Sequence, residues 1–173
     1  MKRVIPGVAA LVASVSLVAS PLAAQVYVGA NATLPQGDYK EYAKTGWMAT
    51  AGYGFWSTAN EALTVWAEGA YGQNSHEGDH GEKTKLLMVS GAVTYSFSPG
   101  ANTSPYLLGS VGYLSHSYDA GDLGDFDASE SGIGIGAGGG VGFGKFFVEA
   151  RYVMGMGDLD DTKFLMVGAG ILF

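Results

Sequence analysis

The chain has 173 residues, 47% of them hydrophobic, with 28 glycines, no cysteine and a formal net charge of −7. This length suits one domain, and without cysteine there is no disulfide framework and no thiolate metal or nucleophile site. The acidic balance argues against nucleic acid as a partner, because phosphate backbones are bound by basic residues.

The first 24 residues have the features of a secretory signal peptide. Lys2 and Arg3 form a basic start, residues 4–18 form an apolar run, and small residues follow. We expect cleavage after residue 24, or one residue away, which leaves a mature domain over residues 25–173. A retained helical anchor is disfavoured because the apolar run is short and interrupted by proline and serine.

In the mature chain, apolar side chains alternate with glycine, serine, threonine or charged residues. This period of two is typical of β-strands whose two faces meet different surroundings. The alternation occurs in eight segments, at residues 26–34, 47–55, 63–71, 87–97, 107–113, 133–143, 146–154 and 165–173. None supplies the ~20 uninterrupted apolar residues of a membrane helix. An even number of strands is what a single-chain transmembrane barrel requires.

The connections between the segments alternate in length. Shorter links at residues 56–61, 98–105 and 144–145 are predicted on the periplasmic side. Longer and more charged links at residues 35–45, 73–84, 117–131 and 155–162 are predicted to be extracellular loops.

Charges within the strands indicate which solvent each face meets. Glu68, Glu149 and Arg151 all lie on the face opposite the apolar one. A soluble barrel turns its apolar face inward, whereas charge-free apolar faces turned outward form a belt suited to lipid. Backbone amides in hydrocarbon must all be paired, so the sheet must close. We therefore expect an all-β, eight-stranded antiparallel up-and-down transmembrane β-barrel, with these three charges paired in a structural lumen network.

Aromatic residues gather near both ends of the strands, as at two membrane interfaces. Those expected at the short-turn end are Trp56, Phe97, Tyr106, Phe143, Phe146 and Phe173. Those expected at the long-loop end are Trp47, Tyr71, Tyr113 and Tyr152.

Three segments carry a resemblance to a known family. They are residues 105–109, residues 147–152 and the last strand, where Phe173 follows Ile171, Ala169, Val167 and Leu165 at alternate positions. Residues 25–173 resemble the small outer-membrane β-barrel family typified by OmpA and OmpX. The resemblance implies a bacterial outer-membrane protein in contact with outer-membrane lipid and lipopolysaccharide, whose terminal strand is the signal read by the barrel-assembly machinery. The family includes adhesins, structural anchors and proteins of no assigned activity. We expect a monomer.

Two of the expected extracellular loops are acidic. Their carboxylates are Asp119, Asp122, Asp125, Asp127 and Glu130 in the third loop and Asp158, Asp160 and Asp161 in the fourth. This set could bind divalent cations or contact cation-bridged lipopolysaccharide, although the spacing of an EF-hand is absent. A solvated, mutually repulsive face is the simpler interpretation.

Two motifs raise the question of catalysis. Residues 76–80 spell His-Glu-Gly-Asp-His, which resembles a zinc-protease pattern, but that mechanism needs a helix and Gly78 interrupts the segment. Ser115, His116 and Ser117 are the candidates for a lipid-modifying site, yet adjacent strand residues point to opposite faces. We expect no enzymatic activity and no cofactor.

The expected function is therefore envelope integrity, or adhesion through the acidic loops. A small channel is the main alternative. Eight strands leave an interior that side chains can fill, whereas five glycines at alternate positions, Gly134, Gly136, Gly138, Gly140 and Gly142, leave space in it. A lipid A-modifying enzyme is the third possibility.

Overall fold

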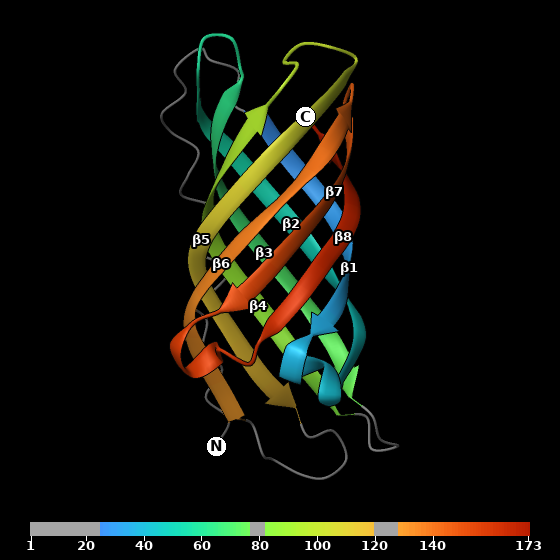
Figure 1. Cartoon of the computed structure of the whole chain (residues 1–173), viewed down its shortest axis with the longest axis vertical. Helices are drawn as coiled ribbons and strands as arrows, with labels where there is room; N and C mark the ends of the chain where they lie inside the picture. The colour runs from blue at the N-terminus through green and yellow to red at the C-terminus, as the bar shows by residue number, and fades with distance from the viewer. Residues whose placement is uncertain (1–24, 77–81, 120–127) are drawn as a thin grey trace, which may run out of the picture.

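The computed structural model describes residues 25–76, 82–119 and 128–173. Eight antiparallel strands close into a barrel in chain order, and β8 pairs with β1 (Figure 1). The strands are β1 (Gln25–Gln36), β2 (Ala43–Ser57), β3 (Leu63–His76), β4 (Lys83–Ser96), β5 (Thr103–Asp119), β6 (Ala128–Phe143), β7 (Phe146–Gly155) and β8 (Lys163–Leu172). The predicted all-β up-and-down barrel is confirmed. The predicted signal peptide lies outside the described residues.

The apolar face of every strand points out of the barrel. Exposed side chains on this surface include Val28, Val89, Val111, Ile133, Val148 and Val167. Between the aromatic residues at the two ends, no charged side chain lies on the outward face of any of the eight described strands. Hydrocarbon is the solvent that suits such a belt, and the stretch from Trp47 to Phe55 matches the ~9–11 residues of a transmembrane strand.

Outward aromatic side chains mark both edges of the belt. Trp47, Tyr71, Tyr113 and Tyr152 are exposed at one end, and Phe55, Trp56, Tyr95, Phe97, Phe143, Phe146 and Phe173 at the other. The assignment of Tyr106 to this group was wrong. It shares the inward parity of Leu108 on β5, and its hydroxyl reaches Glu149 inside the barrel.

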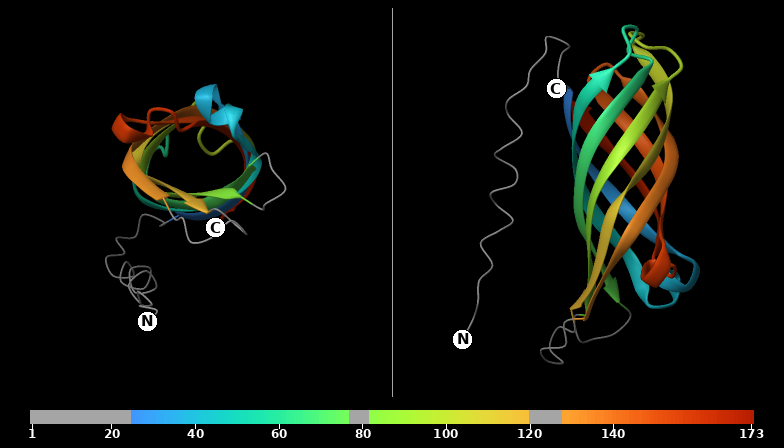
Figure 2. Two further views of the ribbon diagram at one scale, coloured as in Figure 1. Left: turned by 90° about the horizontal axis from the view of Figure 1, so that it is seen from below. Right: turned by 90° about the vertical axis from the view of Figure 1, so that its left-hand side faces the viewer.

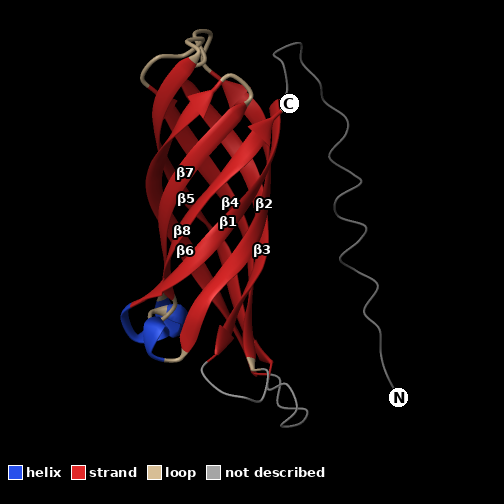
Figure 3. Ribbon diagram, turned by 90° about the vertical axis from the view of Figure 1, so that its right-hand side faces the viewer, coloured by secondary structure: helices blue, strands red, loops and turns tan. Residues whose placement is uncertain are grey.

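The strands extend further toward the long connections than the sequence pattern predicts. β3 continues to His76, and β5 continues to Asp119. The outward side chains of these extensions are polar, as at Ser75, Lys85 and Ser117, so backbone pairing continues after the apolar alternation has ended. Two of the connections hold short 3-10 helices, η1 (Gly37–Glu41) and η3 (Gly157–Leu159), at the end opposite the short turns (Figure 3). No helix among the described residues is long and apolar enough to cross a membrane.

Figure 2 shows the barrel end-on as a ring. The side chains that fill its lumen differ between the two ends. Toward the long connections it holds an apolar cluster of Tyr39, Ala43, Met48, Leu86, Met88, Leu114, Val153, Leu159, Phe164 and Met166. A second, smaller cluster contains Tyr27, Trp66 and Ala92. The half of the lumen next to the long connections therefore differs from the inward face of glycine, serine, threonine and charged residues that the alternation predicts. Methionine, leucine and phenylalanine fill that half.

Candidate functional site

Three charges meet in the middle of the lumen. The guanidinium of Arg151 on β7 forms a bidentate ion pair with the carboxylate of Glu68 on β3. Its Nη1 donates to Oε2 at 2.6 Å, and its Nη2 donates to Oε1 at 3.1 Å. Its Nε also donates to Glu149 Oε1 at 3.0 Å. Arg151 is only 6% exposed and Glu68 only 9%. Fork-to-fork pairing of this kind fixes geometry as well as charge, so β3 and β7 are joined across the barrel axis.

Hydroxyl groups complete the bonding of both carboxylates. Tyr27 on β1 donates to Glu68 Oε1 at 2.7 Å, and Tyr106 on β5 donates to Glu149 Oε2 at 3.0 Å. Sequence reasoning assigned neither tyrosine to this network. The inward parity of each tyrosine was a usable signal, but parity does not show which inward residues reach the same height in the barrel.

The glycines of β6 make room for this network. Gly138 is the register partner of Arg151, and Gly140 is the partner of both Tyr106 and Glu149. A Cβ atom at Gly140 would lie 2.5 Å from the Tyr106 hydroxyl oxygen. The predicted glycine face therefore exists. Neighbouring side chains occupy the space that it leaves at Gly136 and Gly140, whereas Gly142 lines an open pocket.

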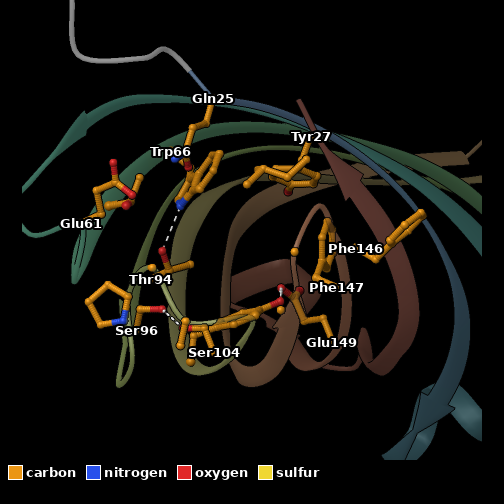
Figure 4. Close-up of a pocket in the computed structure, with 18 of the residues that line it drawn as sticks. Gln25, Tyr27, Glu61, Trp66, Thr94, Ser96, Ser104, Phe146, Phe147 and Glu149 are labelled. Atoms are coloured by element: carbon orange, nitrogen blue, oxygen red, sulfur yellow. Dashed lines mark hydrogen bonds between the residues drawn. The ribbon is translucent and has the colours of Figure 1, made fainter.

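A pocket of about 390 Å³ lies between the charged network and the short turns (Figure 4). Its aromatic wall includes Tyr27, whose ring is 5.5 Å from both Trp66 and Phe147 in edge-to-face contacts. Trp66 Nε1 donates to Thr94 Oγ1 at 3.0 Å. The pocket thus has both aromatic and hydroxyl linings, and suits water or a small amphipathic molecule.

The apolar cluster fills the lumen on the other side of the charged network. Met48, Leu86, Leu114 and Phe164 are all 0% exposed. Tyr39 of η1 and Leu159 of η3 are buried against the same cluster, so both helices cap it. An ion crossing this layer would lose its hydration without gaining a partner, at a cost of several kcal/mol. We call this layer, made of the ten residues of the larger cluster, the apolar seal.

Beyond the apolar seal, a chain of hydrogen bonds crosses the mouth of the barrel. Thr84 Oγ1 lies 2.6 Å from His76 Nε2 and 3.4 Å from His116 Nε2, and His116 Nδ1 lies 3.0 Å from Thr162 Oγ1. Ser117 is on the opposite face of β5 and donates to Ser129 at 3.2 Å. The hydroxyl partners of His116 are therefore threonines, and the serines considered from the sequence do not reach it.

The remaining sequence candidates are distributed around the same end. Asp119 forms an ion pair with Lys85 at 2.7 Å on the outer surface, while Glu130 is the register partner of His116. Three exposed carboxylates lie in or next to η3, at Asp158, Asp160 and Asp161. Asp122, Asp125 and Asp127, and residues 77–80 of the zinc-like pattern, lie outside the described residues. Within the described ranges, no three His, Asp or Glu side chains form a group that could hold a metal ion.

The proposed assembly signal lies on the outer surface of β8. Leu165, Val167, Ala169, Ile171 and Phe173 alternate along the outward face. The Phe173 backbone N–H donates to the Val26 carbonyl oxygen at 2.7 Å, so the final residue closes the seam with β1.

Comparisons with known proteins bear on the fold. No protein-family model matches the sequence, and no curated protein matches it. Solved barrels do match. The fold is that of the small outer-membrane β-barrels. Neisserial surface protein A is 18% identical with a TM-score of 0.59, and the match covers 86% of this chain and 95% of that one.

Two further structures give the same result. Ail of Yersinia pestis, solved with the heparin analogue sucrose octasulfate, has a TM-score of 0.52 at 19% identity, with 87% of this chain and 97% of that one covered. The outer membrane enzyme PagL has a TM-score of 0.56 at 15% identity, with 86% and 98% covered. The chain therefore shares its fold with both an attachment protein and an enzyme.

Proposed function

We propose that the protein is a non-enzymatic, non-conducting barrel of the bacterial outer membrane. It contributes to envelope integrity and contacts its surroundings through the acidic end that carries the long connections. The apolar seal is the observation that carries this proposal: four of its side chains are entirely buried, as expected of a lumen without a continuous water-filled path. The apolar exterior supports the membrane location.

The distribution of charged residues supports the proposal that the protein contacts its surroundings through the long connections. All acidic residues except Glu61, Glu68 and Glu149 lie in or beside these connections, accompanied by the lysines Lys40, Lys44, Lys83, Lys85 and Lys163. Such a surface attracts cations and cationic partners and repels polyanions. It also suits lipopolysaccharide whose phosphates are bridged by divalent cations. A sulfated ligand such as the one in the Ail structure is disfavoured here.

Conductance in planar bilayers tests the closed lumen. The refolded mature protein should give no stable single-channel steps, because the apolar seal excludes ions. The variant carrying both Met48→Ala and Leu114→Ala thins that layer and serves as the matched comparison. Stable current steps from the unmodified protein would contradict the proposal.

Cells lacking the protein test the role of the acidic end. We expect increased entry of a hydrophobic dye, or reduced surface attachment, which the unmodified protein restores. A variant with Asn at Asp158, Asp160 and Asp161 should restore less, whereas Glu61→Gln at the opposite end should restore fully. Equal rescue by both variants would contradict a role for the acidic end.

Mass spectrometry of lipid A tests the enzymatic alternative that the PagL match raises. The proposal predicts identical lipid A acylation in cells with and without the protein. A loss or gain of an acyl chain that depends on His116 would overturn it.

A further inference from the structure

A second pocket, of about 410 Å³, lies at the mouth of the barrel beyond the apolar seal. Its lining consists of Tyr42, His76, Glu82, His116, Tyr118 and Glu130. These residues come from β3, β5, β6, the position just before β4 and the segment that follows η1. Four aromatic rings and two carboxylates therefore meet in one place, with no lysine or arginine among these described lining residues.

The four lining rings are connected into one series through Tyr39, which is itself fully buried and does not line the pocket. The centroid of His76 lies 5.2 Å from that of Tyr118 and 5.6 Å from that of Tyr42. Tyr39 follows, 5.4 Å from Tyr42 and 5.7 Å from His116. Because aromatic faces carry partial negative charge, a pocket lined by these rings favours a positively charged ligand.

Acidic side chains near the pocket also favour a positively charged ligand. Burial raises the pKa of the Tyr42 phenol, and the negative charges of Asp161, Glu130 and Asp38 raise it further. Three acidic side chains from different elements thus act on one lining residue. Glu130 is also the register partner of His116, and Tyr118 is placed to hydrogen-bond Glu82.

We propose that this pocket binds a small organic ammonium ion. Ammonium groups bind over aromatic faces by cation–π attraction, and methylated ones suit aromatic enclosures particularly well. The carboxylates oppose an anion. A coordinated metal ion needs a group of ligands that the described residues do not form. The inference is independent of whether the protein acts in adhesion or in envelope integrity.

Choline and its uncharged carbon analogue, 3,3-dimethylbutan-1-ol, test the proposal directly. The two molecules have the same shape but differ in charge. The full mature protein is refolded in a maltoside detergent, since phosphocholine detergents carry the same cation, and binding is measured by saturation-transfer NMR or calorimetry. We expect saturable choline binding and binding of the alcohol weaker by about 5-fold or more. Equal binding of the two, or none of choline, would overturn the proposal.

Substitutions locate the bound cation. Tyr42→Ala should weaken choline binding by about 2- to 5-fold, whereas Tyr42→Phe keeps the ring and should retain affinity. Glu130→Gln should weaken choline binding by about 2- to 5-fold. Glu61 lines the pocket at the other end of the barrel, so Glu61→Gln should leave choline binding unchanged.

Each variant is first checked for the folded band on an unheated gel. If Glu61→Gln weakens binding as much as Glu130→Gln, the site is not at the mouth. The wild-type comparison of choline with the alcohol stands even if a variant does not fold.

Discussion

Replacing Arg151 with alanine should destabilise the barrel strongly. The guanidinium makes hydrogen bonds to Glu68 and Glu149, and their side chains are only 7% and 13% exposed. Without it, two carboxylates would be buried side by side with only hydroxyl groups to solvate them. Removing one partner of such a buried pair costs about 3–5 kcal/mol. We expect a loss of this size in the free energy of unfolding.

Urea titration in detergent micelles, followed by tryptophan fluorescence and by the folded band on unheated gels, measures this loss. Lys85→Ala is the matched control, because it removes one cation from an exposed pair with Asp119 and should cost about 1 kcal/mol or less. Combining Arg151→Met with Glu68→Gln and Glu149→Gln should recover most of the stability, since no buried charge is then left unpaired. If Arg151→Ala lowers the free energy of unfolding no more than Lys85→Ala does, the reasoning is refuted.

Three further predictions concern packing and assembly. Gly140→Ala should lower the free energy of unfolding by about 1–3 kcal/mol, because its methyl group would lie 2.5 Å from a tyrosine hydroxyl oxygen and would also meet backbone. Phe164→Ala should cost about 3–5 kcal/mol, because Phe164 is 0% exposed within the apolar seal. Deleting Phe173 should reduce the amount of barrel assembled in cells far more than it reduces the yield of refolding in detergent, since its side chain is exposed and its proposed role is recognition. Urea titration measures the first two losses, and surface protease protection the third.

Each of these predictions has an internal control. Gly109→Ala places a methyl group where nothing lies within 4 Å, so stability should change by less than about 0.5 kcal/mol. Phe97→Ala removes a side chain that is 57% exposed on the outer surface and should cost less than Phe164→Ala. Equal losses for the inward and outward members of either pair would contradict the assigned faces. Equal defects in cells and in refolding for the Phe173 deletion would reduce its role to closing the seam.

The fold was predictable because a single period decides it. Each strand repeats apolar residues at every second position, and one outward residue such as Val111 then fixes the face of all its strand neighbours. The same parity placed Glu68, Glu149 and Arg151 inside, and the structure shows the three in contact.

The interior was less predictable, because inward positions do not reveal their height or their partners. Met48 and Leu114 are ordinary inward residues in the sequence, yet both belong to one buried apolar cluster in the lumen. Tyr39 lies in a connection with no β-pattern, so nothing in the sequence marked it as a buried cap. The pocket at the mouth needs His76 and Tyr118 at strand ends that were predicted to be loop.

The central claim is that hydrocarbon contacts the outward faces of the strands. The chain has no cysteine, so single-cysteine variants can carry a spin label at one chosen position. In liposomes, Val111→Cys on the outward face should be accessible to oxygen and shielded from a water-soluble nickel complex, whereas Ser117→Cys beyond the aromatic belt should show the reverse. A label at Val111 that collides freely with the nickel complex would contradict the account.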